Sequence, residues 1–388
     1  MRAYTIGSSL SEAIDYDRES LCYLKDKYGD QIDSAISELK SIRFEFNEFQ
    51  NIYISGIDRN LAFRQGFPIC IAHSASFNHK PGLVDILTCY FLGQTMILNH
   101  IDRHLDLSSS YTINDPKILL KDVRTTMCYS VGLQYAAAIQ CSRRGGSSEF
   151  LSEMYKVSSY IIQSMYQNYI HRFQYREIEN IDIKLNYYLN DKRSPLFGSG
   201  FYESGIRGCF AFYGEPVPNN MAQLLRTMRI FRQRVDQLAD YGEDLATGML
   251  TYPTLMLLKF TQPDNAKYKR TISDLWQYSE KLLLKTRDDA SIGCCIIKSD
   301  TFVEQTIELL SEEMKELGVW DFLYQETKQV WELCKLKCAT CFTDGCLDLE
   351  LIIDLKMAFL DRLRFQNWKD IPVNEFIFQE NGARNNGD

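Results

Sequence analysis

Two pairs of acidic residues in this chain have the type and the spacing that could hold a metal ion. The first pair is Asp102 and Asp106, and the second pair is Asp236 and Asp240. Residues four apart share one face of a helix, so each pair places two like charges about one turn apart, where they repel. A bridging cation removes that repulsion, and oxygen-only ligands suit Mg²⁺, which also binds water and phosphate oxygens. The alternative is a solvated acidic face, and the recurrence of the pair on two otherwise apolar helices favours the metal.

Two further sets of residues could bind other metals. His100 and His104 are also four residues apart, but no third zinc ligand accompanies them. Cys334, Cys338 and Cys341 have a C-x3-C-x2-C spacing that can hold an iron–sulfur cluster. These cysteines lie late in the chain within a helical pattern, where cysteine packs well as a small hydrophobic residue. We therefore expect packing cysteines, and neither a zinc site nor a cluster.

Helical periodicity dominates the segments that must position the acidic pairs. Apolar residues recur at i, i+3 and i+4 over residues 83–107, 150–173, 221–241 and 272–284. Several of the nine prolines, Pro218 among them, stand where a helix should begin or end. Because strand–turn–strand alternation is absent, the pattern predicts an all-α, single-domain helical bundle. Both acidic pairs should face its central active-site cavity.

Composition excludes several classes of protein. The 388-residue chain is 45% hydrophobic and carries 43 basic and 51 acidic residues, for a net charge of −8. That balance, without a basic stripe, argues against a nucleic-acid partner. The N-terminus lacks the apolar region of a signal peptide, and no apolar run reaches the roughly 18 residues of a membrane span. We expect a soluble, cytoplasmic protein with one domain over residues 1–373 and a disordered polar tail over 374–388.

The acidic pairs resemble the motifs of the trans-isoprenyl diphosphate synthases and the related class I terpene synthases. Both aspartate-rich motifs of that family read D-D-x-x-D. Here the first reads D-R-H-L-D from Asp102 to Asp106, and the second reads D-Q-L-A-D from Asp236 to Asp240. Each motif keeps the first and fifth positions, which face the metals in the family, and replaces the second aspartate. The resemblance implies that these four acids hold Mg²⁺, three ions in all, which Mn²⁺ can replace.

The sequence around the second motif extends the resemblance. The family's D-L-x-x-G-x-x-T-x-P pattern is matched by D-L-A-T-G-M-L-T-Y-P over residues 244–253. Its K-T-x-x-L-F pattern, whose lysine binds the diphosphate, is resembled by K-R-S-P-L-F from Lys192, and Gln233 stands where a glutamine is usual. The resemblance implies a diphosphate site formed by Lys192 and Gln233, to which Arg226 and Arg229 would contribute.

A second anion site of the family is altered, and this favours one reaction over another. Chain-elongating members bind isopentenyl diphosphate through G-K-R-x-R-P before the first motif, whereas Pro68 here is preceded by Arg64, Gln65 and Phe67. Arginine grips phosphate oxygens bidentately, which glutamine and phenylalanine cannot do. The resemblance therefore implies a terpene cyclase. Such an enzyme ionises one prenyl diphosphate, releases pyrophosphate and cyclises the cation to a hydrocarbon.

The length of the substrate is indicated by the residues before the first motif. A bulky aromatic residue four or five positions before the first aspartate shortens the pocket in the prenyltransferases. Ile97 and Leu98 stand there and form the expected cavity floor. This favours farnesyl diphosphate and a sesquiterpene product, followed by geranylgeranyl diphosphate.

Two other functions remain open. The chain could be a trans-prenyltransferase of the farnesyl or geranylgeranyl diphosphate synthase type whose site for isopentenyl diphosphate has diverged in sequence. A catalytically inactive regulatory subunit would account for the lost middle aspartates. Relatives of this kind are commonly homodimers, so the resemblance implies a homodimer.

Overall fold

The computed structural model describes residues 4, 9–41, 43, 45, 50, 139, 143, 148–153, 172–174, 178–183, 185, 200–288, 300–341 and 347–366. Within this part of the chain every regular element is a helix, which confirms the all-α prediction. The helices are α1 (Leu10–Ser41), α9 (Gly200–Phe212), α10 (Asn219–Ala239), α11 (Tyr241–Ala246), α12 (Tyr252–Phe260), α13 (Ala266–Asp288), α15 (Thr301–Glu316), α16 (Val319–Cys341) and α17 (Leu347–Phe365). None of these helices is both long enough and apolar enough to cross a membrane. The tail over 374–388 lies outside the described residues.

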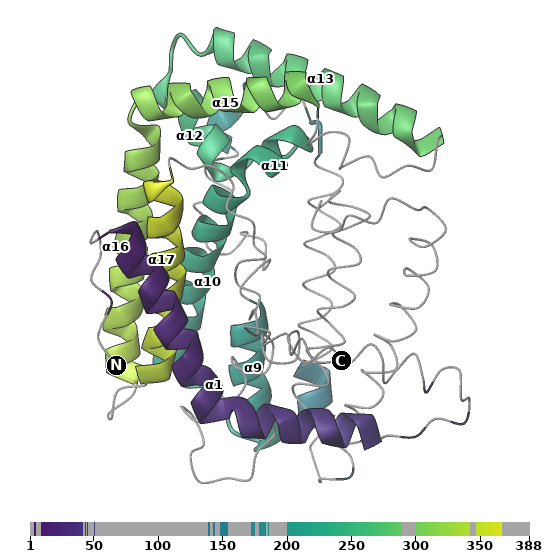
Figure 1. The fold of residues 1–388 in the computed structure, drawn as a ribbon, viewed down its shortest axis with the longest axis vertical. Coiled ribbons are helices and arrows are strands. Elements are labelled where there is room, and N and C mark those ends of the chain that lie inside the picture. Colours follow the sequence, from purple (N-terminus) through teal and green to yellow (C-terminus); the bar gives the residue numbers. More distant parts are fainter. Residues whose placement is uncertain are drawn as a thin grey trace, which may run out of the picture.

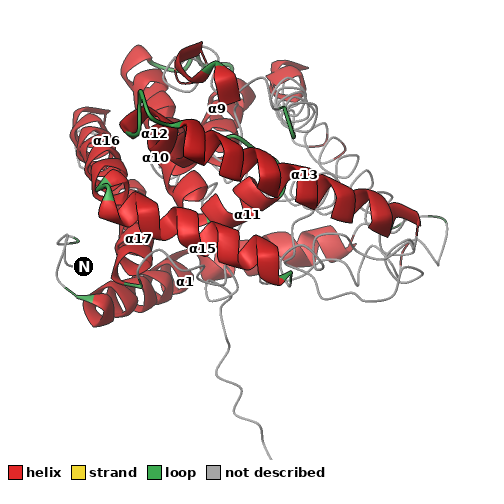
Figure 2. Cartoon of the chain, turned by 90° about the horizontal axis from the view of Figure 1, so that it is seen from above, coloured by secondary structure: helices red, strands yellow, loops and turns green. Residues whose placement is uncertain are grey.

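Helices from distant parts of the sequence pack into one bundle. α10 packs against both α16 and α17, and α1 packs along α17 (Figure 1). α13 and α15 contact each other and run across one end of this group (Figures 1 and 2). The first and the last described helices are therefore direct neighbours.

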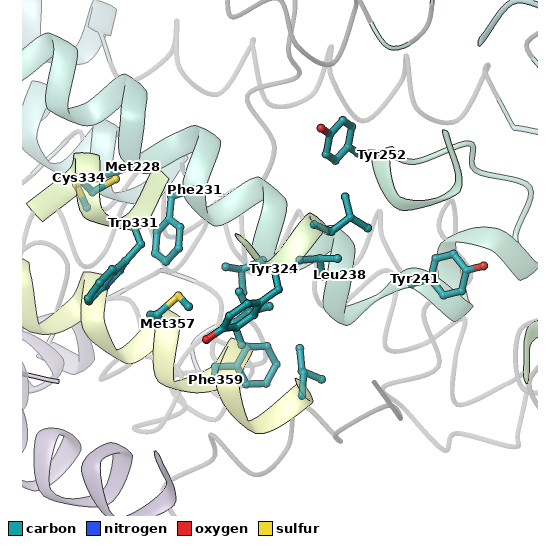
Figure 3. Close-up of a cluster of buried hydrophobic side chains, with 14 of the residues drawn as sticks. Met228, Phe231, Leu238, Tyr241, Tyr252, Tyr324, Trp331, Cys334, Met357 and Phe359 are labelled. Atoms are coloured by element: carbon teal, nitrogen blue, oxygen red, sulfur yellow. The ribbon is translucent and has the colours of Figure 1, made fainter. Parts of the chain in front are cut away.

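The core forms where the apolar faces of α10, α16 and α17 meet. Phe231 and Leu238 of α10 point toward α16 and α17 in Figure 3. Tyr324 and Trp331 of α16 and Phe359 of α17 complete this part of the core, and all five side chains are buried. Phe231 and Leu238 lie two turns apart, so they occupy one face of α10. Burial of side chains of this size contributes about 1.5–3 kcal/mol each, and this contact fixes the position of α10.

Local sequence signals mark where several helices begin. Pro218 is the N-cap residue of α10, with φ −59° and ψ 147°, which confirms the predicted role of this proline at a helix end. Pro253 lies in the first turn of α12, where a missing backbone N–H leaves no helical hydrogen bond unmade. The Asp300 carboxylate caps α15 by accepting hydrogen bonds from the backbone N–H groups of Phe302 at 3.0 Å and Val303 at 3.2 Å.

A row of buried carboxylates on α17 holds α1 in place. The row consists of Asp348, Asp354 and Asp361, all less than 6% exposed. The Asp348 carboxylate accepts a hydrogen bond from the Lys27 ammonium of α1 at 2.6 Å, and the Asp361 carboxylate accepts one from the hydroxyl of Tyr4, which precedes α1, also at 2.6 Å. Buried carboxylates are tolerated only when they are paired in this way. The row therefore determines which segments pack against α17, and it also stabilises the contact between α1 and α17.

One buried ion pair joins α1 to α17 directly. Arg362 donates a hydrogen bond to the carboxylate of Asp17 at 2.8 Å, and the two side chains are only 6% and 7% exposed. Burial raises the pKa of Asp17 to about 6, while the nearby Arg362 guanidinium acts in the opposite direction. Desolvation therefore outweighs the attraction between the two charges.

The cysteines of the C-x3-C-x2-C sequence are packing residues, as the sequence analysis predicted. Cys334, Cys338 and Cys341 lie on α16, and the first two are fully buried. Burial raises the pKa of the Cys334 thiol well above its usual range. A buried, protonated thiol packs as a small hydrophobic side chain.

Candidate functional site

The second acidic motif belongs to a polar stripe along α10. Arg226, Arg229, Gln233, Asp236 and Asp240 follow one another at intervals of three and four residues, which places them on one face of a helix. The buried residues of α10, including those that contact α16, occupy the opposite face. The structure thus brings together on one helix face every site residue that the sequence analysis proposed in this region.

The stripe continues past the end of α10 through a bend. α10 ends at Ala239, and Asp240 is its C-cap residue, with φ −98° and ψ 14°. The backbone N–H of Asp240 still donates to the Asp236 carbonyl at 2.9 Å, and the N–H of Asp244 donates to the Asp240 carbonyl at 2.8 Å. Asp236, Asp240 and Asp244 therefore succeed one another at one-turn intervals. The sequence analysis included Asp244 only in the D-L-x-x-G-x-x-T-x-P pattern, although its i, i+4 spacing from Asp240 could have marked it as a third acid of the site.

The carboxylate of Asp236 lies between two cations. Nε of Arg232, one turn earlier on α10, is 3.5 Å from Oδ2 of Asp236, and Nζ of Lys356 on α17 is 3.5 Å from Oδ1. The Asp236 side chain is 33% exposed, so solvent and ligands can still reach it. The Lys356 ammonium also lies 5.8 Å from the centroid of the Phe359 ring. The sequence analysis missed both cations, and only Arg232 carried a local signal, the i, i+4 spacing from Asp236.

A turn at Gly248 follows the acids and is held by contacts from other parts of the chain. Gly248 has φ +83°, which L side chains rarely adopt, and a Cβ atom there would lie 2.4 Å from the Phe173 ring. Phe173 donates its backbone N–H to the Gly248 carbonyl at 2.8 Å. The indole Nε1 of Trp276 donates to the Leu245 carbonyl at 2.9 Å. The backbone conformation and the nearby Phe173 ring explain why this position of the D-L-x-x-G sequence requires glycine. The two hydrogen bonds fix the turn that follows Asp244.

Replacing Gly248 by alanine should therefore lower the free energy of unfolding by about 2–5 kcal/mol. A left-handed backbone costs about 1–2 kcal/mol for a residue with a Cβ atom, and the overlap with the Phe173 ring adds about 1–3 kcal/mol. Gly214→Ala is the matched control, because Gly214 has φ +69° but nothing within 4 Å of a Cβ. Urea unfolding of both variants measures the difference. Equal losses in the two variants would contradict the role of Phe173.

The segment after the turn is tied to two neighbouring helices. The hydroxyl of Tyr252, at the start of α12, donates to the Glu326 carboxylate of α16 at 2.5 Å. Arg234 of α10 reaches the same carboxylate at 3.3 Å and lies 5.1 Å from the centroid of the Tyr252 ring. Burial raises the pKa of Tyr252 well above its usual range, so its hydroxyl remains a donor. The acids and their flanking turn are thus held on a fixed scaffold.

Other predicted site residues lie outside the described residues. These are the first-motif acids Asp102 and Asp106, the diphosphate lysine Lys192, and the cavity-floor residues Ile97 and Leu98. Their place relative to the α10 stripe stays a prediction.

The chemistry of the described acids fits a hard divalent cation. Asp236, Asp240 and Asp244 offer only carboxylate oxygens, and Asp240 is exposed. Among the described residues, no three acidic, histidine or cysteine side chains converge closely enough to hold a metal ion. Mg²⁺ needs no such cage, because it takes one or two carboxylates and completes its coordination with water and phosphate oxygens. The residues present therefore fit a hard divalent cation such as Mg²⁺.

Comparison with known proteins gives fold-level matches. The chain matches no protein-family model and no curated protein sequence. Among solved structures it resembles a decaprenyl diphosphate synthase from Rhodobacter capsulatus, with a TM-score of 0.60 and 14% identity over 87% of this chain and 98% of that chain. The chain has the fold of a prenyl diphosphate synthase.

Two further solved structures support the same fold. A polyprenyl synthase from Caulobacter crescentus, complexed with calcium and isoprenyl diphosphate, matches with a TM-score of 0.54 and 13% identity over 91% of this chain and 98% of that chain. A geranylgeranyl pyrophosphate synthetase from Pyrococcus horikoshii matches with a TM-score of 0.54 and 15% identity over 88% of this chain and 98% of that chain. Because each match spans almost the whole of the other protein, the shared prenyl synthase fold extends over the entire length of those enzymes.

Proposed function

We propose that this chain is a Mg²⁺-dependent enzyme that ionises a prenyl diphosphate. The observation that carries the proposal is the polar stripe of α10, which runs from two arginines through Gln233 to Asp236 and Asp240. Its order, cationic and amide donors followed by carboxylates, suits a diphosphate bound beside a divalent cation. The fold shared with prenyl diphosphate synthases supports this assignment.

Each residue of the stripe has a chemical role in this proposal. Asp236 and Asp240 would hold Mg²⁺ together with Asp102 and Asp106. Three further residues, Arg226, Arg229 and Gln233, and with them Lys192, would donate hydrogen bonds to the diphosphate oxygens. Bound Mg²⁺ would offset the negative charge that develops on the leaving group. Donors fixed on a rigid helix need no rearrangement as that charge grows, which is how such sites lower a barrier.

The comparisons favour a trans-prenyltransferase as the reaction. The solved structures with the same fold are named as decaprenyl, polyprenyl and geranylgeranyl diphosphate synthases. In this reaction the allyl cation left by the diphosphate is attacked by the double bond of a second substrate, and the product is a longer linear diphosphate.

A terpene cyclase is the second candidate, and a specific observation favours it. Gln65 and Phe67 stand where chain-elongating enzymes carry basic residues for the second diphosphate. Loss of two charge-assisted hydrogen bonds, at about 1.5–3 kcal/mol each, would weaken that co-substrate by two to four orders of magnitude. The cation would then react with its own double bonds in a cavity that excludes water.

A product assay separates these possibilities. Purified protein with C10, C15 or C20 prenyl diphosphate should release pyrophosphate only when Mg²⁺ or Mn²⁺ is present, with farnesyl diphosphate as the preferred substrate. A longer linear diphosphate on addition of isopentenyl diphosphate identifies a prenyltransferase, and an extractable hydrocarbon without it identifies a cyclase. If no pyrophosphate is released from any substrate, the enzymatic proposal is wrong and a regulatory subunit remains.

A further inference from the structure

Lys356 is an unusual residue for its position on α17. From residue 351 to residue 363 every side chain is buried except that of Lys356, which is 30% exposed. Lysine is rarely placed within a buried segment unless it has a partner. Here the partner is Asp236, whose Oδ1 atom lies 3.5 Å from the Lys356 ammonium.

The direction of this lysine separates it from its charged neighbours on α17. Asp354, two residues earlier, accepts hydrogen bonds from the hydroxyl of Tyr16 on α1 and from the indole N–H of Trp331 on α16, and so lies between α1 and α16. Lys356 is near enough to Asp17 of α1 to act against the rise in the pKa of that carboxyl, but the carboxylate with which it forms an ion pair is that of Asp236 on α10. Arg232 lies on the other side of the Asp236 carboxylate, so two positive charges surround one acid.

This arrangement affects how a divalent cation can bind. A second positive charge within a few ångströms of a metal ion is repulsive at any effective dielectric constant of the protein. An ion pair that is one-third exposed is weak, so Lys356 can leave Asp236 when a stronger ligand arrives. An anion that enters with the metal compensates the excess positive charge and gives the displaced ammonium a new partner.

We propose that Lys356 is the counter-ion of Asp236, competing with the metal for this carboxylate and pairing with the diphosphate once the metal is bound. The inference rests on the proposed function, because it takes Asp236 as a metal ligand. It adds to the site a diphosphate-binding residue from α17, a helix that carries neither of the two aspartate motifs. It also predicts that the metal alone binds weakly and that metal and diphosphate bind cooperatively.

The first test measures Mn²⁺ binding without any prenyl substrate, by electron paramagnetic resonance of the free ion. Lys356→Gln should bind Mn²⁺ roughly fivefold more tightly than the native protein at low ionic strength, and the difference should shrink as salt is added. Lys356→Arg should restore native affinity, because it keeps the charge. Lys267→Gln is the matched control, since Lys267 forms a comparable pair with Glu313 between α13 and α15.

The second test uses inorganic pyrophosphate in saturating Mg²⁺, followed by titration calorimetry. Lys356→Gln should bind pyrophosphate roughly fivefold more weakly, because one charge-assisted contact is lost. A purely structural role would not produce opposite changes in the two affinities. Lys356→Met, which keeps an apolar stem beside Phe359, replaces the glutamine variant if thermal unfolding shows that the latter is not folded.

The outcomes distinguish this inference from the proposed function. Unchanged or weaker Mn²⁺ binding in the charge-removing variants, or no Mn²⁺ binding in any protein, overturns the counter-ion role. If Lys356→Gln tightens Mn²⁺ binding but the native protein releases no pyrophosphate from prenyl diphosphates, the proposed function fails and the counter-ion role stands. Turnover in the native protein with unchanged Mn²⁺ binding in the variants removes the counter-ion role alone.

Discussion

Asp236→Asn should reduce kcat for pyrophosphate release by about a thousandfold while leaving the free energy of unfolding within about 1 kcal/mol of the native value. The large kinetic effect follows because a neutral amide is a poor ligand for Mg²⁺, and preorganised charge stabilisation of this kind contributes roughly 10²–10³ in rate. The small effect on stability follows because the Asp236 side chain is one-third exposed and its ion pairs are long. Such pairs contribute little to stability.

The control for this variant is Asp182→Asn. Asp182 is 69% exposed and pairs with Lys259 on the surface, so the same loss of one charge occurs away from the α10 stripe. Pyrophosphate release and urea unfolding are measured on both variants. If Asp236→Asn retains full activity, or if Asp182→Asn loses as much, the assignment of the second motif is wrong.

Arg362→Gln should lower the free energy of unfolding by about 3–5 kcal/mol at pH 8. The guanidinium of Arg362 bonds the Asp17 carboxylate at 2.8 Å, and both groups are almost completely buried. Removing one partner leaves the other as an uncompensated buried charge, which carries a penalty of this size. Urea unfolding followed by far-ultraviolet circular dichroism measures the loss.

The loss should depend on pH in a defined direction. Burial raises the pKa of Asp17 to about 6 in the folded protein, above roughly 3.9 in the unfolded chain. The contribution of Asp17 to stability is therefore fully present below about pH 4 and falls as the pH rises through about 6. Without Arg362 the folded pKa rises further, so the decline continues to higher pH. The two proteins should differ least near pH 4 and most near pH 8.

Arg364→Gln provides the control on the same helix. Arg364 pairs with Asp321 at 3.8 Å and lies 4.4 Å from the centroid of the Tyr324 ring, and the two charged side chains are 38% and 75% exposed. Its replacement should lower the free energy of unfolding by less than about 2 kcal/mol at either pH, because an exposed ion pair and an exposed cation–π contact each contribute at most about 1 kcal/mol. A pH-independent loss in Arg362→Gln would mean that the variant disturbs packing rather than the charge of Asp17.

The parts of the fold that the sequence predicted are those governed by local periodicity. The apolar pattern over 221–241 predicted α10, and the observed helix covers Asn219–Ala239. The predicted end is late because the chain bends at Asp240 and continues as α11, a change of direction that the apolar spacing does not record. The i, i+4 spacing likewise predicted that Asp236 and Asp240 lie one turn apart, and the backbone N–H of Asp240 does donate to the Asp236 carbonyl.

The parts that the sequence did not predict depend on contacts between distant residues. Lys356 lies 120 residues from Asp236 (356 − 236) and follows no motif, so only the packing of α17 against α10 brings the two together. Asp17 and Arg362 likewise belong to no motif, and only the packing of α1 against α17 makes them a buried ion pair. A signal was present in the seven-residue spacing of Asp354 and Asp361 within an apolar helix, which is the pattern of buried charges that need partners.

The pairing of α1 with α17 also determines when this protein can finish folding during synthesis. Tyr4 and its partner Asp361 are 357 residues apart, and Lys27 and Asp348 are 321 residues apart. At roughly 5–20 residues per second, α1 leaves the ribosome about 20–70 seconds before the helix that covers it. During that interval the apolar face that α1 later buries has no native partner from α17. Completion of the bundle therefore waits until α17 has been synthesised, and topologies closed by such distant contacts fold slowly.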